Sequence, residues 1–102
     1  MIIDGDTVRA PGANVRLTGE GGASFDAPET WEPECRAEAE LGAQATDQLR
    51  ALMPGQLCIV GYGVGSYGRD LGVLYDRDGQ DVRGTLIERS LAKGSKNAAW
   101  CD

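Results

Sequence analysis

The spacing of hydrophobic positions divides the chain into strand-like and helix-like stretches. Residues 2–9 and 14–18 are rich in apolar and β-branched residues, which is typical of strands. The segment APGA at 10–13 separates them, and its proline and glycine favour a tight turn. The two strands are therefore expected to pair antiparallel as a hairpin.

The stretch 33–53 has helical spacing instead. Apolar residues recur on one helical face at Leu41, Ala45, Leu49 and Leu52. Acidic residues in the first turns favour the positive end of a helix dipole, and the Pro-Gly pair at 54–55 favours a stop. This stretch is expected to be the long helix of the fold.

The remaining pattern predicts two more strands and a short helix. The strands are expected at 56–64 and 70–79, and the helix at 81–92 with Val82, Leu86 and Ile87 facing inward. Strands, a helix, more strands and a second helix favour a small β-barrel with attached helices over βαβ units. The 102 residues suffice for one domain, 1–102.

Charge and hydropathy restrict the classes of function. The net charge of −6 argues against unaided binding to a polyanion, because nucleic-acid affinity depends mainly on Lys and Arg contacts to phosphates. Any such contact would need a cation or local arginines. No apolar run reaches the roughly 20 residues of a membrane span, so no membrane partner is expected. The start, MIIDGDTVRA, lacks the pattern of a signal peptide.

The three cysteines and the absence of histidine argue against a zinc site. An odd number leaves room for one disulfide and one free thiol. Cys58 lies in an apolar run and is expected to be the buried, unpaired one.

Two motifs resemble ligand-binding loops but do not fit the patterns of those loops. GVGSYG at 63–68 fits the dinucleotide-binding spacing, but a strand rather than a helix is predicted after it. It is therefore interpreted as a loop between strands. The segment DGDTVRAPGANV lacks the glycine and glutamate positions of an EF-hand, which leaves a calcium site of another design open.

Six charged residues are predicted at strand ends. Each alone has an ordinary explanation as a turn residue, a helix cap or a surface ion pair. Together they provide carboxylates that can hold a cation and activate water, and arginines that can bind a phosphate. This combination favours metal-assisted hydrolysis of a phosphodiester, and its members are Asp4, Asp6, Arg16, Asp26, Glu29 and Arg69.

The order of short motifs resembles the staphylococcal-nuclease-like (thermonuclease) domain family. The motifs are IDGDTV, VRLTG, FDAPET, YGRDLGVLY, DGQDV and LIERSLA, and they span nearly the whole chain. The resemblance implies an OB-fold, a five-stranded β-barrel with one long and one short helix. It also implies calcium-dependent cleavage of DNA or RNA.

The resemblance also implies a set of metal ligands and a general base. Asp6 and Asp26 would supply the calcium carboxylates, and Ala27 would add its backbone carbonyl. Glu29 would be the general base or would orient the attacking water. Asp4 and Thr7 would support the metal site.

Further roles follow from the same resemblance. Arg16 and Arg69 would bind the scissile phosphate, and Tyr67 would line the nucleotide pocket. Cys35 and Cys101 match positions of paired cysteines in secreted members, which predicts a disulfide. Arg69 is expected to matter more than any lysine, because Lys93 and Lys96 are far from the acidic residues in sequence.

The chain departs from the family pattern in three places. The extra segment EGGAS at 20–24 separates Arg16 from Asp26, and it is expected to be a flexible loop on the barrel rim whose deletion improves the site. Most of the first strand is missing, so the barrel is expected to be incomplete there, and the chain a monomer or a homodimer. Ser90 replaces a glycine at a helix end, with a modest stability cost expected.

Two other classes of function stay open. The chain could be a catalytically inactive OB-fold module that binds nucleic acid or protein, or a structural domain whose charges only solvate its surface. The compartment is open as well: the cytoplasm fits the chain as written, and an oxidising location fits if a leader has been removed.

Overall fold

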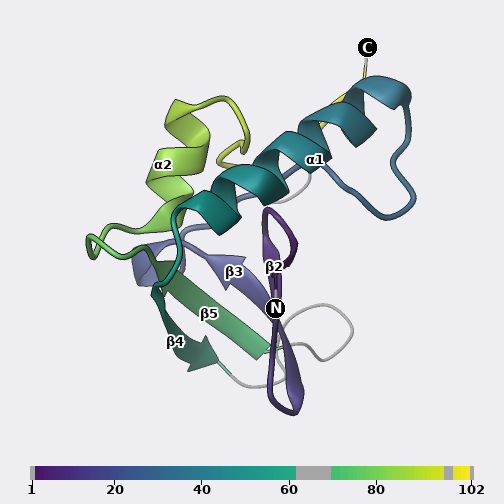
Figure 1. Ribbon diagram of the computed structural model, residues 1–102. Coiled ribbons are helices and arrows are strands. Elements are labelled where there is room, and N and C mark those ends of the chain that lie inside the picture. The colour runs from purple at the N-terminus through teal and green to yellow at the C-terminus, as the bar shows by residue number, and fades with distance from the viewer. Residues whose placement is uncertain (1, 62–69, 96–97, 102) are drawn as a thin grey trace.

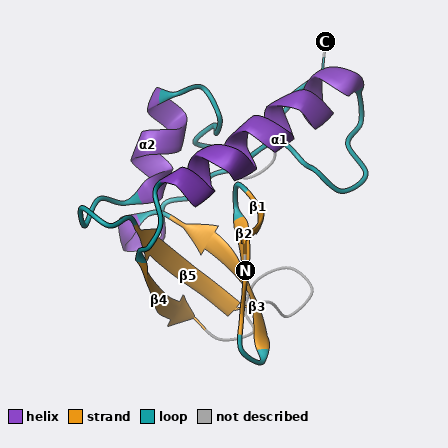
Figure 2. Cartoon of the chain, in the orientation of Figure 1, coloured by secondary structure: helices purple, strands orange, loops and turns teal. Residues whose placement is uncertain are grey.

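The computed structural model describes residues 2–61, 70–95 and 98–101 of the chain. One sheet forms the lower layer in the view of Figure 1, and two helices lie together above it (Figures 1 and 2). Helix α1 contacts the first strand and α2, and α2 contacts the last strand. The glycine-rich segment 63–68 falls outside the described residues.

The elements follow the predicted order with one addition. The strands are β1 (Ile2–Asp4), β2 (Thr7–Ala10), β3 (Ala13–Thr18), β4 (Gln56–Gly61) and β5 (Asp70–Tyr75), and the helices are α1 (Arg36–Ala51) and α2 (Val82–Glu88). The sheet order is β1-β2-β3-β5-β4. Strands β3 and β5 are parallel, and the other neighbours are antiparallel.

The single strand predicted at 2–9 is wrong, because the chain turns at Gly5 and pairs β1 with β2. A Cβ atom on Gly5 would lie 2.8 Å from the Ala27 Cβ and 3.0 Å from the Ala45 Cβ of α1. Only a glycine therefore fits at this position. The turn places Asp4 and Asp6 on its two sides.

The predicted five strands and the long and short helices are present, but the sheet is not closed into a barrel. In the parts of the chain that the structure describes, the sheet order leaves β1 and β4 as its two edges. Strand β1 has only three residues and an irregular register with β2. Little of its backbone is therefore available to pair with another strand and close a barrel.

Helix α1 lies within the predicted range 33–53. It begins after Cys35, whose sulfur accepts a hydrogen bond from the Glu38 N–H as an N-cap. It ends at Ala51, before the Pro-Gly pair at 54–55. No helix among the described residues is long and apolar enough to cross a membrane.

Helix α2 begins after Asp81, whose side chain caps it by accepting the Arg83 N–H over 3.0 Å. The chain leaves α2 through Ser90, which has a φ of 60°. Ser90 and Leu91 donate their N–H groups to Ile87 and Leu86 at the helix end. The backbone conformation that favours glycine at this position is therefore present, as predicted.

Strand β5 is shorter than the predicted 70–79. The next residue after the strand, Asp76, is buried, and its side chain accepts hydrogen bonds from the N–H groups of Asp78 and Gln80. These hydrogen bonds form a turn directly after Tyr75. The prediction of a strand at 56–64 holds as far as Gly61, and its remainder lies outside the described residues.

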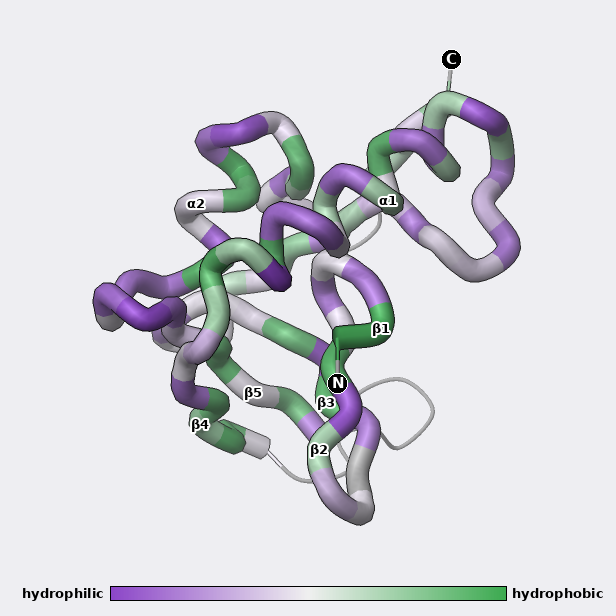
Figure 3. The backbone as a smooth tube through the Cα atoms, viewed as in Figure 1, coloured by the Kyte–Doolittle hydropathy of each residue, from purple (hydrophilic) through white to green (hydrophobic). Residues whose placement is uncertain are grey.

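The hydrophobic core lies between the sheet and the two helices. Hydrophobic and hydrophilic stretches alternate along both helices (Figure 3), as expected for helices that bury one face. The buried core residues are Val8, Val15, Leu17, Phe25, Ala45, Leu49, Leu74, Val82, Leu86, Leu91 and Ala92.

Candidate functional site

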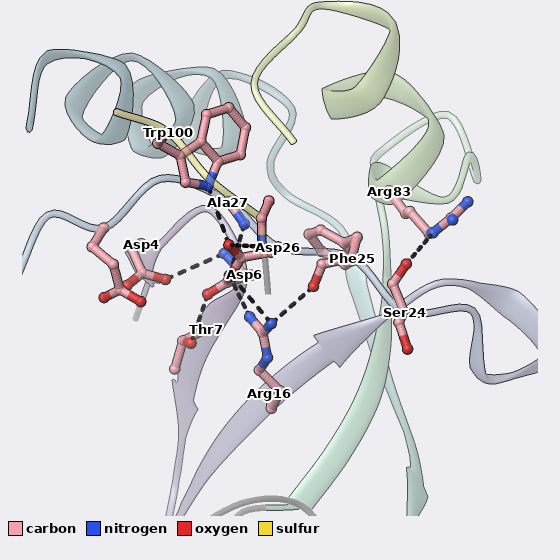
Figure 4. Close-up of polar contacts among 12 residues, drawn as sticks. Asp4, Asp6, Thr7, Arg16, Ser24, Phe25, Asp26, Ala27, Arg83 and Trp100 are labelled. Atoms are coloured by element: carbon pink, nitrogen blue, oxygen red, sulfur yellow. Dashed lines mark hydrogen bonds and ion pairs between the residues drawn. The ribbon is translucent and has the colours of Figure 1, made fainter. Parts of the chain in front are cut away.

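The structure brings together Asp6, Arg16 and Asp26, three of the predicted site residues. Arg16 rises from β3 and forms an ion pair with Asp6 through Nη1, and its Nη2 lies 3.5 Å from Asp26 Oδ1 (Figure 4). Nη2 also donates to the Phe25 carbonyl over 2.8 Å. One guanidinium thus links the β1–β2 turn to the segment that follows β3.

The Asp6 carboxylate is almost fully enclosed, with 4% of its side chain exposed. Its Oδ2 accepts the Ala27 N–H over 2.9 Å in addition to Arg16. Its Oδ1 accepts the Thr7 hydroxyl over 3.0 Å. These contacts fix Asp6 next to Ala27, which the resemblance also assigned to the metal site.

The extra segment 20–24 returns Asp26 to Arg16, but it is not the free rim loop that the sequence suggested. It contains a turn of 3₁₀ helix, η1 (Glu20–Gly22), and is tied to the start of α2. The Glu20 N–H donates to Asp81 Oδ2 over 2.8 Å, and Arg83 donates to the Ser24 carbonyl over 3.0 Å. The segment is held by hydrogen bonds at both ends. The loss of conformational entropy on ligand binding should therefore be small.

Deleting Glu20 through Ser24 is therefore expected to destabilise the protein by about 2 kcal/mol, because two hydrogen bonds to charged side chains are lost. Calcium affinity is not expected to improve. Denaturant unfolding and a calcium titration measure the two effects. Glu20→Ala is the control, because it keeps the backbone donor and should change stability by less than about 0.5 kcal/mol. A deletion variant that matches the parent in stability and binds calcium more tightly would restore the flexible-loop hypothesis.

Helix α1 holds the segment that carries Glu29. The buried Glu38 of α1 accepts the Glu29 N–H over 3.0 Å and the Glu34 N–H over 2.8 Å. A Cβ atom on Gly42 would lie 2.6 Å from the Glu29 carbonyl oxygen, so glycine is needed there for close approach. Glu38 and Gly42 are positioning residues that the sequence reasoning missed.

Two neighbouring aspartates have opposite pKa shifts. Burial, followed by the hydrogen bond and the charge of Asp6, raises the pKa of Asp4 to about 8. Burial opposes ionisation of Asp6 too, but hydrogen bonding with Asp4 and the charge of Arg16 outweigh it and lower the pKa of Asp6. The shared environment therefore favours the protonated form at Asp4 and the charged form at Asp6.

The raised pKa of Asp4 predicts a stability that falls with pH. Unfolded Asp4 loses its proton near 3.8, whereas folded Asp4 keeps it to about 8. The folded state thus binds more protons across this window, and stability falls as the pH rises through it. The lowered pKa of Asp6 acts in the other direction and below this window, where stability is lost as the pH falls.

Asp4→Asn should reduce the fall, because asparagine is neutral and keeps an acceptor for the Asp6 N–H, and a smaller fall should remain from the raised pKa values of Asp26 and Glu29. The variant is expected to be similar to the parent near pH 4 and more stable by several kcal/mol at about pH 8, because each pH unit between the two pKa values is worth about 1.4 kcal/mol. Urea unfolding at several pH values measures the slope. Asp47→Asn, on the exposed face of α1, is the control. A variant with the parent's slope would mean that Asp4 is ionised in the folded protein.

The pKa values of Asp26 and Glu29 are also raised. Burial raises the pKa of Asp26, the Trp100 hydrogen bond opposes this, and the charge of Asp6 adds to it. Partial desolvation of the Glu29 carboxylate, followed by the charges of Asp6 and Asp26, raises the pKa of Glu29. These negative charges favour the protonated form of Glu29.

The C-terminal segment reaches the site, which the sequence reasoning missed. Asp26 and Lys93 exchange backbone hydrogen bonds of 2.9 Å in both directions. The Trp100 indole Nε1–H donates to Asp26 Oδ2 over 3.1 Å. Lys93 is far from the acidic residues in sequence, but it lies beside Asp26 in space because the chain folds back after α2. Both contacts join residues far apart in sequence and have no local signal.

The predicted disulfide between Cys35 and Cys101 is present, with Cα atoms 6.1 Å apart. Cys58 is the free cysteine, as expected, but it is half-buried rather than buried. It lies on β4 at the sheet edge, where part of its surface stays open.

Two of the predicted site residues, Arg69 and Tyr67, lie outside the described residues. Their predicted roles in phosphate and nucleotide binding stay predictions.

The carboxylate oxygens of the site are of the chemical type that hard divalent cations prefer. Within residues 2–61, 70–95 and 98–101, no three side chains of His, Cys, Asp or Glu are arranged to hold a metal. The carboxylates of Asp6 and Asp26, however, come from separate segments and face the same guanidinium. Together with Glu29, these residues supply three carboxylates against the single positive charge of Arg16. The group therefore has a net negative charge. Calcium takes about six to eight oxygen ligands, and waters and phosphate oxygens commonly complete such a set.

Comparison with known proteins adds one relative. No family model matches the chain. Over 97 residues it is 34% identical to the succinoglycan biosynthesis protein ExoI of Rhizobium meliloti (strain 1021). The match covers 89% of this chain and 48% of that protein, so the chain spans about half the length of the curated relative it matches. That protein's name places it in succinoglycan biosynthesis and says nothing of nuclease activity.

Proposed function

We propose that the chain is a calcium-dependent nuclease with an OB-like fold that hydrolyses phosphodiester bonds of DNA or RNA. The observation that carries the proposal is the convergence of Asp6 and Asp26 on Arg16. This arrangement combines anionic oxygen ligands with a phosphate-binding fork in one place. The order of the nuclease-like motifs along the sequence supports the same assignment.

In this proposal Asp6, Asp26 and the Ala27 carbonyl hold the cation. Bound calcium would polarise the phosphate and neutralise part of its charge. Arg16 binds the phosphate oxygens, because its guanidinium has N–H groups beyond those used by Asp6 and Phe25. It then stabilises the charge that develops on those oxygens in the transition state.

Glu29 accepts the proton of the attacking water. Its raised pKa brings it closer to the working pH, which favours general-base catalysis. The water oxygen forms a bond to phosphorus, and the bond from phosphorus to the leaving sugar oxygen breaks. The leaving oxygen takes a proton from solvent, and Glu29 returns its proton to solvent, which balances the reaction.

The test is cleavage of denatured DNA and of RNA by the purified protein. Cleavage should require calcium, stop with a chelator, and fall by roughly 10²- to 10⁴-fold in Glu29→Gln. Glu40→Gln, on the exposed face of α1, is the matched control and should cleave like the parent. Cleavage that persists in chelator, or in Glu29→Gln, would contradict the mechanism.

A catalytically inactive binding module is the second candidate. It is favoured by the hydrogen bonds and ion pairs that already engage Asp6 and Asp26 within the protein. Retention of nucleic acid in a gel-shift assay, without cleavage at any calcium concentration, would select this function.

A further inference from the structure

The two oxygens of the Asp26 carboxylate have different partners. Oδ1 lies 3.5 Å from Arg16 Nη2 and faces the site. Oδ2 accepts two N–H groups of the C-terminal segment, from Ala98 over 3.2 Å and from Trp100 Nε1 over 3.1 Å (Figure 4). The terminal torsion of an aspartate is broad by itself, so these two donors select one orientation of the carboxylate.

Lys93 keeps Trp100 in reach of Asp26. Its backbone pairs with that of Asp26 in both directions over 2.9 Å. Its ammonium lies 4.6 Å from the centroid of the Trp100 ring and donates to the Ala99 carbonyl over 2.6 Å. One residue therefore fixes both the carboxylate's backbone and the indole that holds its side chain.

The disulfide anchors the same segment from the other side. Cys101 follows Trp100 directly and is bonded to Cys35, the N-cap of α1. Figure 1 shows the C-terminus at the beginning of α1, next to the long connection that leads into it. The indole is thus held between Lys93 and a covalent link to the helix that also supports Glu29 through Glu38.

We propose that Trp100 is a positioning residue that sets the orientation of the Asp26 carboxylate, and that Lys93 and the Cys35–Cys101 disulfide hold it in place for this task. The inference rests on the proposed function, in which Asp26 is a cation ligand. Hydrogen bonds from neighbouring residues to ligating carboxylates orient them, and their loss commonly costs 10- to 100-fold in metal affinity.

The first measurement uses the metal-free protein and does not depend on calcium. The indole N–H resonances of Trp31 and Trp100 are followed by NMR in the parent and in Asp26→Asn. The Trp100 resonance should shift because its acceptor loses its charge. The Trp31 resonance should stay, because that side chain is 75% exposed. An unchanged Trp100 resonance would overturn the inference.

The second measurement is calcium affinity by titration calorimetry. Trp100→Phe keeps a ring over Lys93 but loses the N–H donor, so affinity should fall by roughly 10- to 100-fold. Trp31→Phe is the matched control and should bind calcium like the parent. Cys35→Ser with Cys101→Ser should weaken binding in the same direction, which supplies a second variant if Trp100→Phe does not fold.

The outcomes separate the inference from the proposed function. A parent protein that binds no calcium overturns the proposed function. A parent that binds calcium, together with a folded Trp100→Phe of equal affinity, overturns the inference alone. Reduced affinity in Trp100→Phe with unchanged affinity in Trp31→Phe supports it.

Discussion

Arg16→Ala is expected to reduce cleavage by at least about 100-fold and to lower the free energy of unfolding by about 3 to 5 kcal/mol. Arg16 is the counter-charge of Asp6, whose side chain is only 4% exposed. It also donates to the Phe25 carbonyl. Its loss would leave a buried carboxylate without a counter-charge and, in the proposed mechanism, a phosphate without its arginine. Denaturant unfolding and cleavage of denatured DNA measure the two effects.

Arg16→Lys separates the effect of the positive charge at this position from the effect of the planar guanidinium group. The ammonium should restore most of the stability, because it still neutralises Asp6. A lysine lacks the planar fork that reaches several oxygens at once, so cleavage should stay at least about ten-fold below the parent. Arg36→Ala is the control: this residue is 91% exposed, and its loss should change stability by less than about 0.5 kcal/mol. Full cleavage by Arg16→Ala would place phosphate binding elsewhere.

The approach of the Asp6 and Arg16 backbones could be predicted from the sequence because a tight turn sets the register of a hairpin. The turn at 11–12 pairs Ala10 with Ala13, and the same register pairs Thr7 with Arg16. Asp6 precedes Thr7, so it lies beside Arg16, and its carbonyl accepts the Leu17 N–H over 2.8 Å. The hairpin register therefore brings the two backbones close, but successive side chains of a strand point to opposite faces, so the contact between the Asp6 and Arg16 side chains also depends on the turn at residues 5–6.

Helix α1 was predictable for a similar reason. Its apolar spacing, its acidic first turn and the Pro-Gly pair after it are all local signals. The break at Gly5 also has a local signal, the Asp-Gly pair at 4–5, which the sequence reasoning did not use to divide the strand. Ala27 and Ala45, which lie far along the chain, then require a glycine at this turn.

Contacts that close the site from the C-terminal side had no signal in the sequence. Asp26 meets Ala98 and Trp100 across 72 and 74 positions of sequence, and Glu20 meets Asp81 across 61. Such contacts depend on how α2 and the segment after it pack on the sheet. Hydrophobic periodicity predicts which face of each element is buried, but it does not predict the hydrogen-bond partners of individual polar groups.

Removal of the disulfide is expected to destabilise the protein by about 4 kcal/mol, because the bridge closes a loop across 66 positions. The test variant carries Cys35→Ser and Cys101→Ser. Serine at position 35 can still accept the Glu38 N–H as an N-cap, so the loss should come from the cross-link rather than from the start of α1. Denaturant unfolding of parent and variant measures the difference.

Cys58→Ser is the control, because this half-buried cysteine is free in the structure and its replacement should cost less than about 1 kcal/mol. Thiol titration of the unfolded parent should find one thiol before reduction and three after it. Equal stability of parent and double variant would show that the bridge does not constrain the unfolded chain. The double variant should lose both stability and calcium affinity, whereas Trp100→Phe should lose mainly calcium affinity. The comparison therefore separates the cross-link's effect on folding from the tryptophan's effect on Asp26.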